Sequence, residues 1–195
     1  EIRVLLGTQM IAKGLDFPNV KLVGIIDADT AIDLPDFRAT ERTFQLVSQV
    51  CGRCGRSEGV ATAIIQTFNP DAPAIVLAGK ADYEKFSNKE ILFRQDAQVP
   101  PITRMARCII RNPNFEHAAG KAEALANRLS DLANGEVVVS SAAACVLPRI
   151  ADRFRFDVTV TAQTAADLQS FLSRARKYIK IGRDVVIDVD PISLL

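Results

Sequence analysis

Two arginines and a glutamine share the octet QVCGRCGR, which is rich in groups that can bind an anion. If the surrounding segment is helical, Gln49, Arg53 and Arg56 lie at i, i+4 and i+7 and share one helix face. Gly52 and Gly55 remove side chains that would keep another surface away, although each glycine costs a helix about 1 kcal/mol. Because a guanidinium binds phosphate bidentately, the octet predicts a phosphate-binding helix face. The alternative is a helix end with two exposed arginines placed well for the helix dipole.

A second polar segment, GTQMIAKGLDFP, occupies residues 7–18 directly after the first strand-like run. Ligand sites of parallel α/β sheets lie beyond the carboxyl ends of the strands, where this segment falls. It lacks the G-x-x-x-x-G-K-[ST] pattern of a P-loop. Its polar and flexible residues suit a ribose or a phosphodiester, and they are Thr8, Gln9, Lys13, Gly14 and Asp16. The alternative is an ordinary strand-to-helix connection with Asp16 as its cap.

Two carboxylates, Asp27 and Asp29, follow the next strand-like run at the same predicted sheet edge. Paired carboxylates at a strand end can bind a metal or act as acid and base. They also cap turns, and this is the role that the sequence favours. If the arginines of the octet reach the same edge, three consecutive segments converge on one cleft.

Cys51 and Cys54 form a C-x-x-C pair, which can indicate metal or redox chemistry. A zinc site needs a second pair at short spacing, and His117 is the only histidine. Cys108 and Cys145 lie in unrelated apolar segments. We therefore predict no metal site in this chain and interpret the cysteines as structural thiols of a reducing cytoplasm.

The first half of the chain alternates between strand-like and helical patterns. Strands are predicted over residues 3–6, 20–26 and 61–67, and helices over 40–54 and 73–80. Apolar strands without clean alternation, separated by helices, are typical of a parallel sheet covered on both faces. The first half therefore predicts an α/β fold.

The second half predicts an α+β domain with the order β-α-β-β-α-β, in which two helices cover a four-stranded sheet. Apolar stripes indicate helices over 115–133 and from Thr164 onward, the second with a capping-box variant at its start. The strand-like runs cover 104–111, 137–140, 145–150, 154–161 and 184–189. This framework is common and does not identify a function.

The junction Val99-Pro100-Pro101 is stiff, because a residue before proline is pushed out of the α region. We therefore predict a first domain over 1–80, a charged connecting segment over 81–100 and a second domain over 101–195. The 195 residues are 48% hydrophobic with a net charge of +1, as in a soluble globular protein. No apolar run approaches the roughly 18 residues of a membrane span, and no signal peptide is evident.

The charge is uneven along the chain. Residues 1–100 carry 11 Lys and Arg against 13 Asp and Glu, a net −2, whereas residues 101–195 carry 13 against 10, a net +3. This asymmetry mildly favours a nucleic-acid contact in the second half. The chain opens with Glu1 directly before a strand-like run, which suggests a piece of a longer protein.

The sequence from GTQMIAKGLDFP through QVCGRCGRS resembles motifs V and VI of superfamily 2 helicases. More closely, it is similar to the bacterial replication-restart helicases of the primosomal protein N-prime family. The similarity continues through IIQTFNP, YEKFSNKEILFRQ and the Pro100-Pro101 junction to IDVDPISLL. The resemblance implies the end of a second RecA-like helicase lobe followed by a C-terminal domain.

The resemblance also implies roles for the nucleotide-binding residues. Arg53 and Arg56 match the motif VI arginines that meet the phosphates of ATP, and Arg56 is the expected arginine finger. Gln49 would orient that helix or polar groups at the cleft. Gly14 and Asp16 match motif V, which contacts the ribose region of the nucleotide and couples it to DNA.

Further residues are expected near DNA or in structural roles. Thr8, Gln9 and Lys13 would lie near the DNA backbone, while Asp27 and Asp29 would have structural or coupling roles without a metal. The zinc cysteines of the family, its Walker A loop and its magnesium-binding acidic box all belong to segments that this sequence does not contain. ATP and magnesium would therefore be bound mainly by a first lobe, and zinc would belong to the parent protein.

Three arginines of the second half, Arg149, Arg153 and Arg155, are candidates for DNA binding. Arg153 and Arg155 alternate with Phe154 and Phe156, so the arginines either point outward above buried phenylalanines or form a basic face beside exposed aromatics.

The implied parent protein is an ATP-dependent 3'-to-5' DNA helicase that restarts arrested replication forks and initiates primosome assembly in the bacterial cytoplasm, at the nucleoid. The implied partners are branched and single-stranded DNA, single-stranded DNA-binding protein and other primosome proteins, with no membrane. The chain alone would be inactive. The alternatives are a non-catalytic DNA- or protein-binding module and another superfamily 2 repair helicase.

Overall fold

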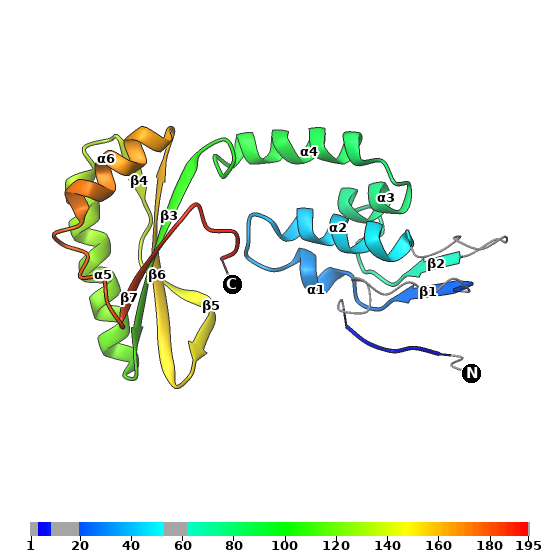
Figure 1. Cartoon of the computed structure of the whole chain (residues 1–195), viewed down its shortest axis with the longest axis horizontal. Coiled ribbons are helices and arrows are strands. Elements are labelled where there is room, and N and C mark those ends of the chain that lie inside the picture. Colours follow the sequence, from blue (N-terminus) through cyan, green and yellow to red (C-terminus); the bar gives the residue numbers. More distant parts are fainter. Residues whose placement is uncertain (1–3, 9–19, 53–61, 195) are drawn as a thin grey trace. The chain divides into compact units, whose positions relative to one another are not determined.

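The computed structural model describes residues 4–8, 20–52 and 62–194 (Figure 1). The chain forms two compact units. The first comprises residues 1–34 and 38–92, and the second comprises Pro35–Phe37 and Phe93–Leu195. No described helix is long and apolar enough to cross a membrane.

The first unit contains two parallel strands and the helices around them. Strand β1 (Leu22–Ile25) pairs with β2 (Thr62–Ile65), with Leu22 opposite Thr62. The helices are α1 (Asp29–Ile32), α2 (Ala39–Cys51), α3 (Pro73–Gly79) and most of α4 (Tyr83–Asp96). These elements confirm the predicted strands near 20–26 and 61–67 and the predicted helices near 40–54 and 73–80.

One prediction about the first half was wrong. Residues 4–7 form no strand, although a strand was predicted from Arg3, which lies outside the described residues. The charged segment 81–100, predicted only as a connection, is mostly the helix α4. Asp82 starts this helix by accepting a hydrogen bond from the Lys85 amide at 3.0 Å.

The core of the first unit is small. Its buried side chains come from α2, α3 and α4, and the rings of Phe44 and Phe86 stack with centroids 4.0 Å apart. The buried set is Phe44, Val47, Ala74, Leu77, Ala78 and Phe86.

The second unit is a split β-α-β sandwich. Its helices are α5 (Phe115–Ala133) and α6 (Ala165–Ala175), and both lie on the same face of the sheet (Figure 1). Its strands are β3 (Arg104–Asn112), β4 (Val137–Val139), β5 (Ala143–Ile150), β6 (Arg153–Ala162) and β7 (Val185–Val189). This arrangement is the predicted α+β domain.

The sheet has five antiparallel strands, one for each of the five predicted strand-like runs, although the predicted order β-α-β-β-α-β counts four. Its order is β4-β6-β3-β7, and β5 also pairs with β6. Strand β4 pairs with residues 160–162 of β6, and β5 pairs with residues 153–157, so the two short strands share one edge of β6. The sheet is therefore four strand positions wide, as the predicted order requires.

Local sequence signals explain the limits of the two helices. Asn114 caps α5 by accepting from the His117 amide at 2.9 Å, and the left-handed Asn134 and Gly135 end it. Thr164 caps α6 by accepting from the Asp167 amide at 3.1 Å. The apolar stripes of both helices, including the fully buried Leu129 and Phe171, pack on the sheet.

Candidate functional site

Helix α2 positions the start of the arginine octet. Thr43, Phe44 and Val47 are buried on one side of this helix, whereas Gln49 and Gly52 are exposed. Arg53, Gly55 and Arg56 lie outside the described residues. The structure thus places Gln49 at the exposed C-terminal end of a well-packed helix that leads directly into the two arginines.

The structure shows which backbone groups surround Gly52 at the end of α2. Its amide donates to the Ser48 carbonyl at 2.9 Å, and a Cβ at this position would lie 3.2 Å from the same oxygen. A side chain at this position would require the Ser48 carbonyl to shift by a few tenths of an ångström.

Among the motif V candidates, only Thr8 is described, and it is exposed. Gln9, Lys13, Gly14 and Asp16 lie outside the described residues. Their predicted roles toward ribose, phosphate and DNA stay predictions.

The two carboxylates behind β1 have different environments. Asp29 is buried and accepts hydrogen bonds from the Thr67 hydroxyl at 2.8 Å, the Phe68 amide at 2.8 Å and the Asn69 side-chain amide at 2.9 Å. Asp27 adopts a left-handed backbone with φ 54° and accepts from the Thr30 amide at 3.3 Å. Asp29 therefore ties the end of β1 to the segment that follows β2.

The Asp29 carboxylate titrates below its ordinary range. The Phe68 amide lowers its pKa most, burial opposes this, and Asn69 and Thr67 lower it further. Its oxygens are committed to these donors, and no group of three metal-ligating residues forms among the described residues. The sequence analysis found Asp29 but not its partners, which lie 38 to 40 positions away.

The three predicted DNA-binding arginines of the second unit have unlike surroundings. Arg149 is exposed, pairs with Asp152 at 3.0 Å, and has its guanidinium 5.2 Å from the centre of the Phe154 ring. Arg153 forms an ion pair with Asp184. Arg155 is only 5% exposed and donates to the Leu147 carbonyl at 3.2 Å. Of the three, Arg149 alone presents most of its side chain to solvent.

The phenylalanines between these arginines lie on the helix side of the sheet. Phe154 and Phe156 each pack edge-on against Phe115, with centroids 5.5 and 5.3 Å apart. This supports the simpler alternation, with Arg153 and Arg155 on one face and Phe154 and Phe156 on the other, whereas Arg149 lies beside Phe154. Arg155 departs from the outward orientation because it is buried. The register shift of β5 between Ala144 and Arg149 contains Leu147, whose carbonyl accepts a hydrogen bond from Arg155.

A buried ion pair on the open face of the sheet was missed by the sequence analysis. The Arg107 Nε donates to Asp157 at 2.6 Å, and Arg107 is 1% exposed. Cys145 lies in the same cluster, where burial foremost and Asp157 next raise the pKa of its thiol. Burial also raises the pKa of the Cys108 thiol to about 11. Neither thiol is therefore a reactive nucleophile at neutral pH.

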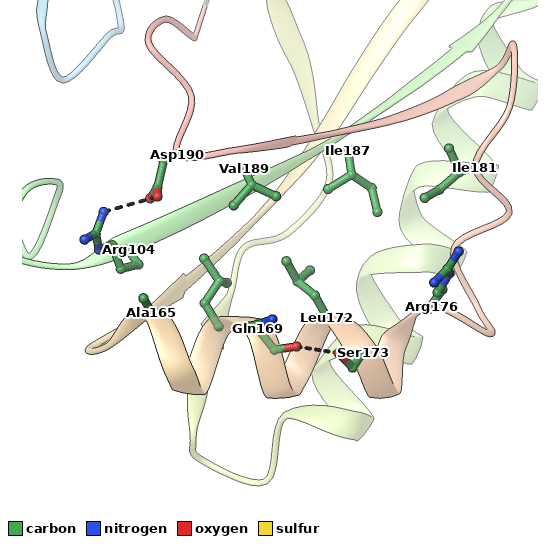
Figure 2. A pocket seen from close by; sticks show the side chains of 11 residues that line it. Arg104, Ala165, Gln169, Leu172, Ser173, Arg176, Ile181, Ile187, Val189 and Asp190 are labelled. Atoms are coloured by element: carbon green, nitrogen blue, oxygen red, sulfur yellow. Dashed lines mark hydrogen bonds and ion pairs between the residues drawn. The ribbon is translucent and has the colours of Figure 1, made fainter.

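A hollow of about 510 Å³ lies between α6 and β7 (Figure 2). Leu168, Leu172 and Ile187 form its apolar floor, and Arg104 and Asp190, paired at 3.2 Å, close one end. Of the predicted site residues that the structure describes, none lines this hollow.

Comparisons with known proteins agree with this division of the chain. Residues 95–192 match the family model described as primosomal protein N C-terminal domain, and residues 1–58 match the helicase conserved C-terminal domain. The second match confirms the predicted fold class of the first unit, which is part of a RecA-like lobe. The first match also argues against an unrelated superfamily 2 repair helicase.

Known proteins are similar in sequence to this chain along nearly its whole length. The replication restart protein PriA of Bacillus subtilis is 39% identical over 190 residues, which is 96% of this chain and 24% of that protein. The proteins of the same name from Treponema pallidum and Borreliella burgdorferi are 40% and 34% identical, each over 100% of this chain and 30% of the relative. The chain thus spans less than a third of the length of these relatives.

The match over more than half of its residues and the relatives' agreement along its whole length show that the chain belongs to the primosomal protein N family of replication restart proteins.

Proposed function

We propose that this chain supplies the arginine-bearing half of the ATP site of a 3'-to-5' DNA helicase that restarts replication forks. The observation that carries the proposal is QVCGRCGR, which continues directly from the exposed end of α2 inside the segment that matches the helicase domain. Two guanidinium forks three residues apart in the sequence suit the equatorial oxygens of a transferring phosphoryl group.

In this proposal each residue has a separate task. Arg56 stabilises charge that develops on the γ-phosphate, and Arg53 binds the neighbouring phosphates. Gln49 orients the cleft side of α2, while Gly14 and Asp16 contact the ribose region. Thr8, Gln9 and Lys13 contact the DNA backbone.

The proposal assigns the other parts of the active site to segments of the parent protein outside this chain. ATP and its magnesium ion would be held mainly by a first lobe with a Walker A loop, because no P-loop pattern occurs in this sequence. Magnesium would bridge phosphate oxygens when bound. Zinc would belong to the parent protein. The chain alone would be inactive, and the parent would work in the cytoplasm at the nucleoid.

The nucleotide role is tested in a protein of the relatives' full length that contains this chain, called the full-length protein below. Arg56→Ala should lower kcat for DNA-stimulated ATP hydrolysis by about 10³-fold or more, with little change in KM. Arg56→Lys keeps the charge but loses the fork and should recover only part of the rate. An Arg56→Ala protein with unchanged kcat would rule out the arginine finger.

A second function is favoured by the exposed Arg149 on the β5–β6 hairpin. We propose that the second unit binds branched and single-stranded DNA, or the acidic tail of single-stranded DNA-binding protein, and joins other primosome proteins. Arg149 is the favoured phosphate contact, and the ion-paired Arg153 and buried Arg155 support the hairpin.

Salt dependence separates this function from a structural role. Each phosphate contact to single-stranded DNA changes the slope of log K against log salt by about 0.7. Arg149→Ala should lower the slope by one such contact, whereas Arg128→Ala, at an exposed position of α5, should leave it unchanged. Equal slopes for all three proteins would remove Arg149 from the DNA contact.

A further inference from the structure

Three phenylalanines gather at one end of the second unit. Phe115 is the first residue of α5, whereas Phe154 and Phe156 lie near the start of β6. The strand register brings these segments together, because Asn112 at the end of β3 pairs with Phe154. Figure 1 shows that β3 ends, α5 begins and β6 begins at this same end of the sheet. We call the three rings the aromatic platform.

The aromatic platform is anchored to the core and also reaches solvent. Phe156 packs against the main hydrophobic cluster of the unit, and Phe154 is half-buried. Phe115, in contrast, is 48% exposed. Its two ring neighbours therefore hold Phe115 in place while nearly half of its surface faces water.

The rings of the platform meet edge to face. The Phe115 centroid is 5.5 Å from that of Phe154 at an interplanar angle of 90°, and 5.3 Å from that of Phe156 at 68°. In the first unit, Phe44 and Phe86 are instead stacked at 4.0 Å, so each ring covers a face of the other. An edge-to-face pair leaves more of the flat ring surface uncovered, and nucleic-acid bases stack on such surfaces.

A cation lies beside the platform. Arg149 is exposed, and its guanidinium lies 5.2 Å from the centre of the Phe154 ring. Its ion pair with Asp152 at 3.0 Å joins two exposed side chains, and such pairs are weak in water. A guanidinium has five N–H donors, so this single pair leaves donors for a phosphate oxygen. Arg149 therefore offers a phosphate ligand next to the rings.

Further positive charge approaches the same end of the unit. The loop between α6 and β7 has no acidic residue over 176–183, and it leads to Asp184, which pairs with Arg153 of β6. Its exposed cations are Arg176, Lys177, Lys180 and Arg183. Positive charge near an exposed aromatic surface complements a nucleic-acid strand, which carries both phosphates and flat bases.

We propose that the aromatic platform and Arg149 form a binding site for single-stranded DNA, in which an unpaired base stacks on Phe115 and its phosphate binds Arg149. Duplex DNA cannot use the platform in this way, because its bases already stack on one another. An acidic peptide could pair with Arg149 but has no base for Phe115. The inference rests on the proposed DNA-binding role of the second unit. It adds that the DNA is unpaired and names the residue that receives the base.

The test uses the absence of tryptophan from the 195-residue chain. Phe115→Trp introduces a single indole into the platform, and a base that stacks on an indole quenches its fluorescence. The matched control is Phe93→Trp, at a phenylalanine of α4 that is 58% exposed. The probes are oligothymidylate, a DNA duplex of equal length and a polyaspartate peptide. Fluorescence anisotropy gives the affinity of each variant for the DNA probes over a range of salt concentrations.

We expect oligothymidylate to quench Phe115→Trp and to leave Phe93→Trp unchanged, while duplex DNA quenches neither. Phe115→Ala should weaken oligothymidylate binding by about 5- to 100-fold with an unchanged salt slope, because stacking releases no counterions. Phe115→Leu keeps an apolar side chain but has no ring, so it should lose nearly as much affinity. Should Phe115→Ala fail to fold, Phe115→Leu and Phe115→Trp still decide the question.

The contrary outcomes are distinct. The inference is overturned by equal quenching of the two tryptophan variants, by equal quenching with duplex DNA, or by unchanged affinity in Phe115→Ala and Phe115→Leu. Quenching of Phe115→Trp by polyaspartate and not by oligothymidylate would assign the platform to an acidic peptide and overturn it as well. If Arg149→Ala still lowers the salt slope in these cases, the proposed DNA contact stands. A chain that binds no single-stranded DNA would overturn that proposed contact, and the inference with it.

Discussion

The two units of the chain differ in how completely each closes its own core. In the second unit, two helices cover one face of the sheet, and 16 buried residues form one cluster. Among the described residues of the first unit, six form the main buried cluster, and one face of the parallel β1–β2 pair is exposed. Leu22 and Ile64 on this face are 61% and 57% exposed.

The difference separates a unit that closes its own core from the unit that carries the proposed nucleotide-binding residues. Parallel strands are normally covered on both faces, and two strands alone are a marginal sheet. The second unit therefore has a complete hydrophobic core of its own, whereas the octet, the motif V segment and Asp29 all belong to the less complete first unit. The predictions below test this contrast, from the largest expected effect to the smallest.

The core of the second unit should respond most strongly to truncation. Phe171 is fully buried between α6 and the sheet, so Phe171→Ala should lower the free energy of unfolding of this unit by about 3–5 kcal/mol. Val138→Ala, at a residue that is 72% exposed, should change it by less than about 0.5 kcal/mol. Urea unfolding followed by circular dichroism measures both. Similar losses for the two variants would refute a closed core.

The buried Arg107–Asp157 pair should give the next largest effect. Asp157→Asn leaves the Arg107 charge without its partner and should lower the free energy of unfolding by about 3 kcal/mol. The exposed Arg149–Asp152 pair offers the control, since Asp152→Asn should cost less than about 1 kcal/mol. A double variant, Arg107→Met with Asp157→Leu, should recover much of the loss. Equal costs for the two single variants would contradict the burial assigned to Arg107.

In the first unit, Asp29 should make stability depend on acid. The folded pKa lies below the ordinary value of 3.8, so its contribution is complete above the unfolded pKa and is lost as pH falls through the folded pKa. Wild type should therefore lose stability below about pH 4 relative to Asp29→Asn. Carbon NMR of the carboxyl groups and urea unfolding at pH 2.5–6 check this, with the exposed Asp71→Asn as control. Parallel pH curves for wild type and Asp29→Asn would disprove the assignment.

The smallest expected effect concerns the reactivity of the cysteine thiols. Cys108 and Cys145 are buried and their thiol pKa values are raised, whereas Cys51 in the first unit is only half-buried. Iodoacetamide at pH 8 should therefore modify Cys51 in the folded chain, and Cys108 and Cys145 only after unfolding. Mass spectrometry of tryptic peptides gives the rates. Rapid native labelling of Cys108 would mean that the second unit opens readily.

Local signals made much of this fold predictable from the sequence. Helix α5 has the limits 115–133 that its apolar stripe indicates, and β6 includes the predicted strand-like run over 154–161. Helix α4 was not predicted from the sequence because its apolar residues form no stripe at helical spacing. In the structure, three of them in a row, Ile91, Leu92 and Phe93, are exposed. The shared edge of β4 and β5 depends on strand register, which hydrophobic pattern does not reveal.

The candidate site was predictable in its residue types but not in its contacts. Asp29 was singled out, yet its three donors come from a segment about 40 positions away. The burial of Arg155 accompanies a register shift in β5, and the buried Asp36 accepts from Ser193 and Leu194 of the C-terminal segment. Each of these contacts joins distant parts of the chain, and local patterns carry no information about them.

The claim that the first unit holds half of a nucleotide site is tested most directly by ATP hydrolysis with single-stranded DNA present. The 195-residue chain and the full-length protein are compared, each with and without Arg56→Ala. We predict no hydrolysis above buffer by the chain alone, and hydrolysis by the full-length protein that Arg56→Ala reduces by about 10³-fold or more. Hydrolysis by the chain alone at a rate that Arg56→Ala leaves unchanged would contradict this account.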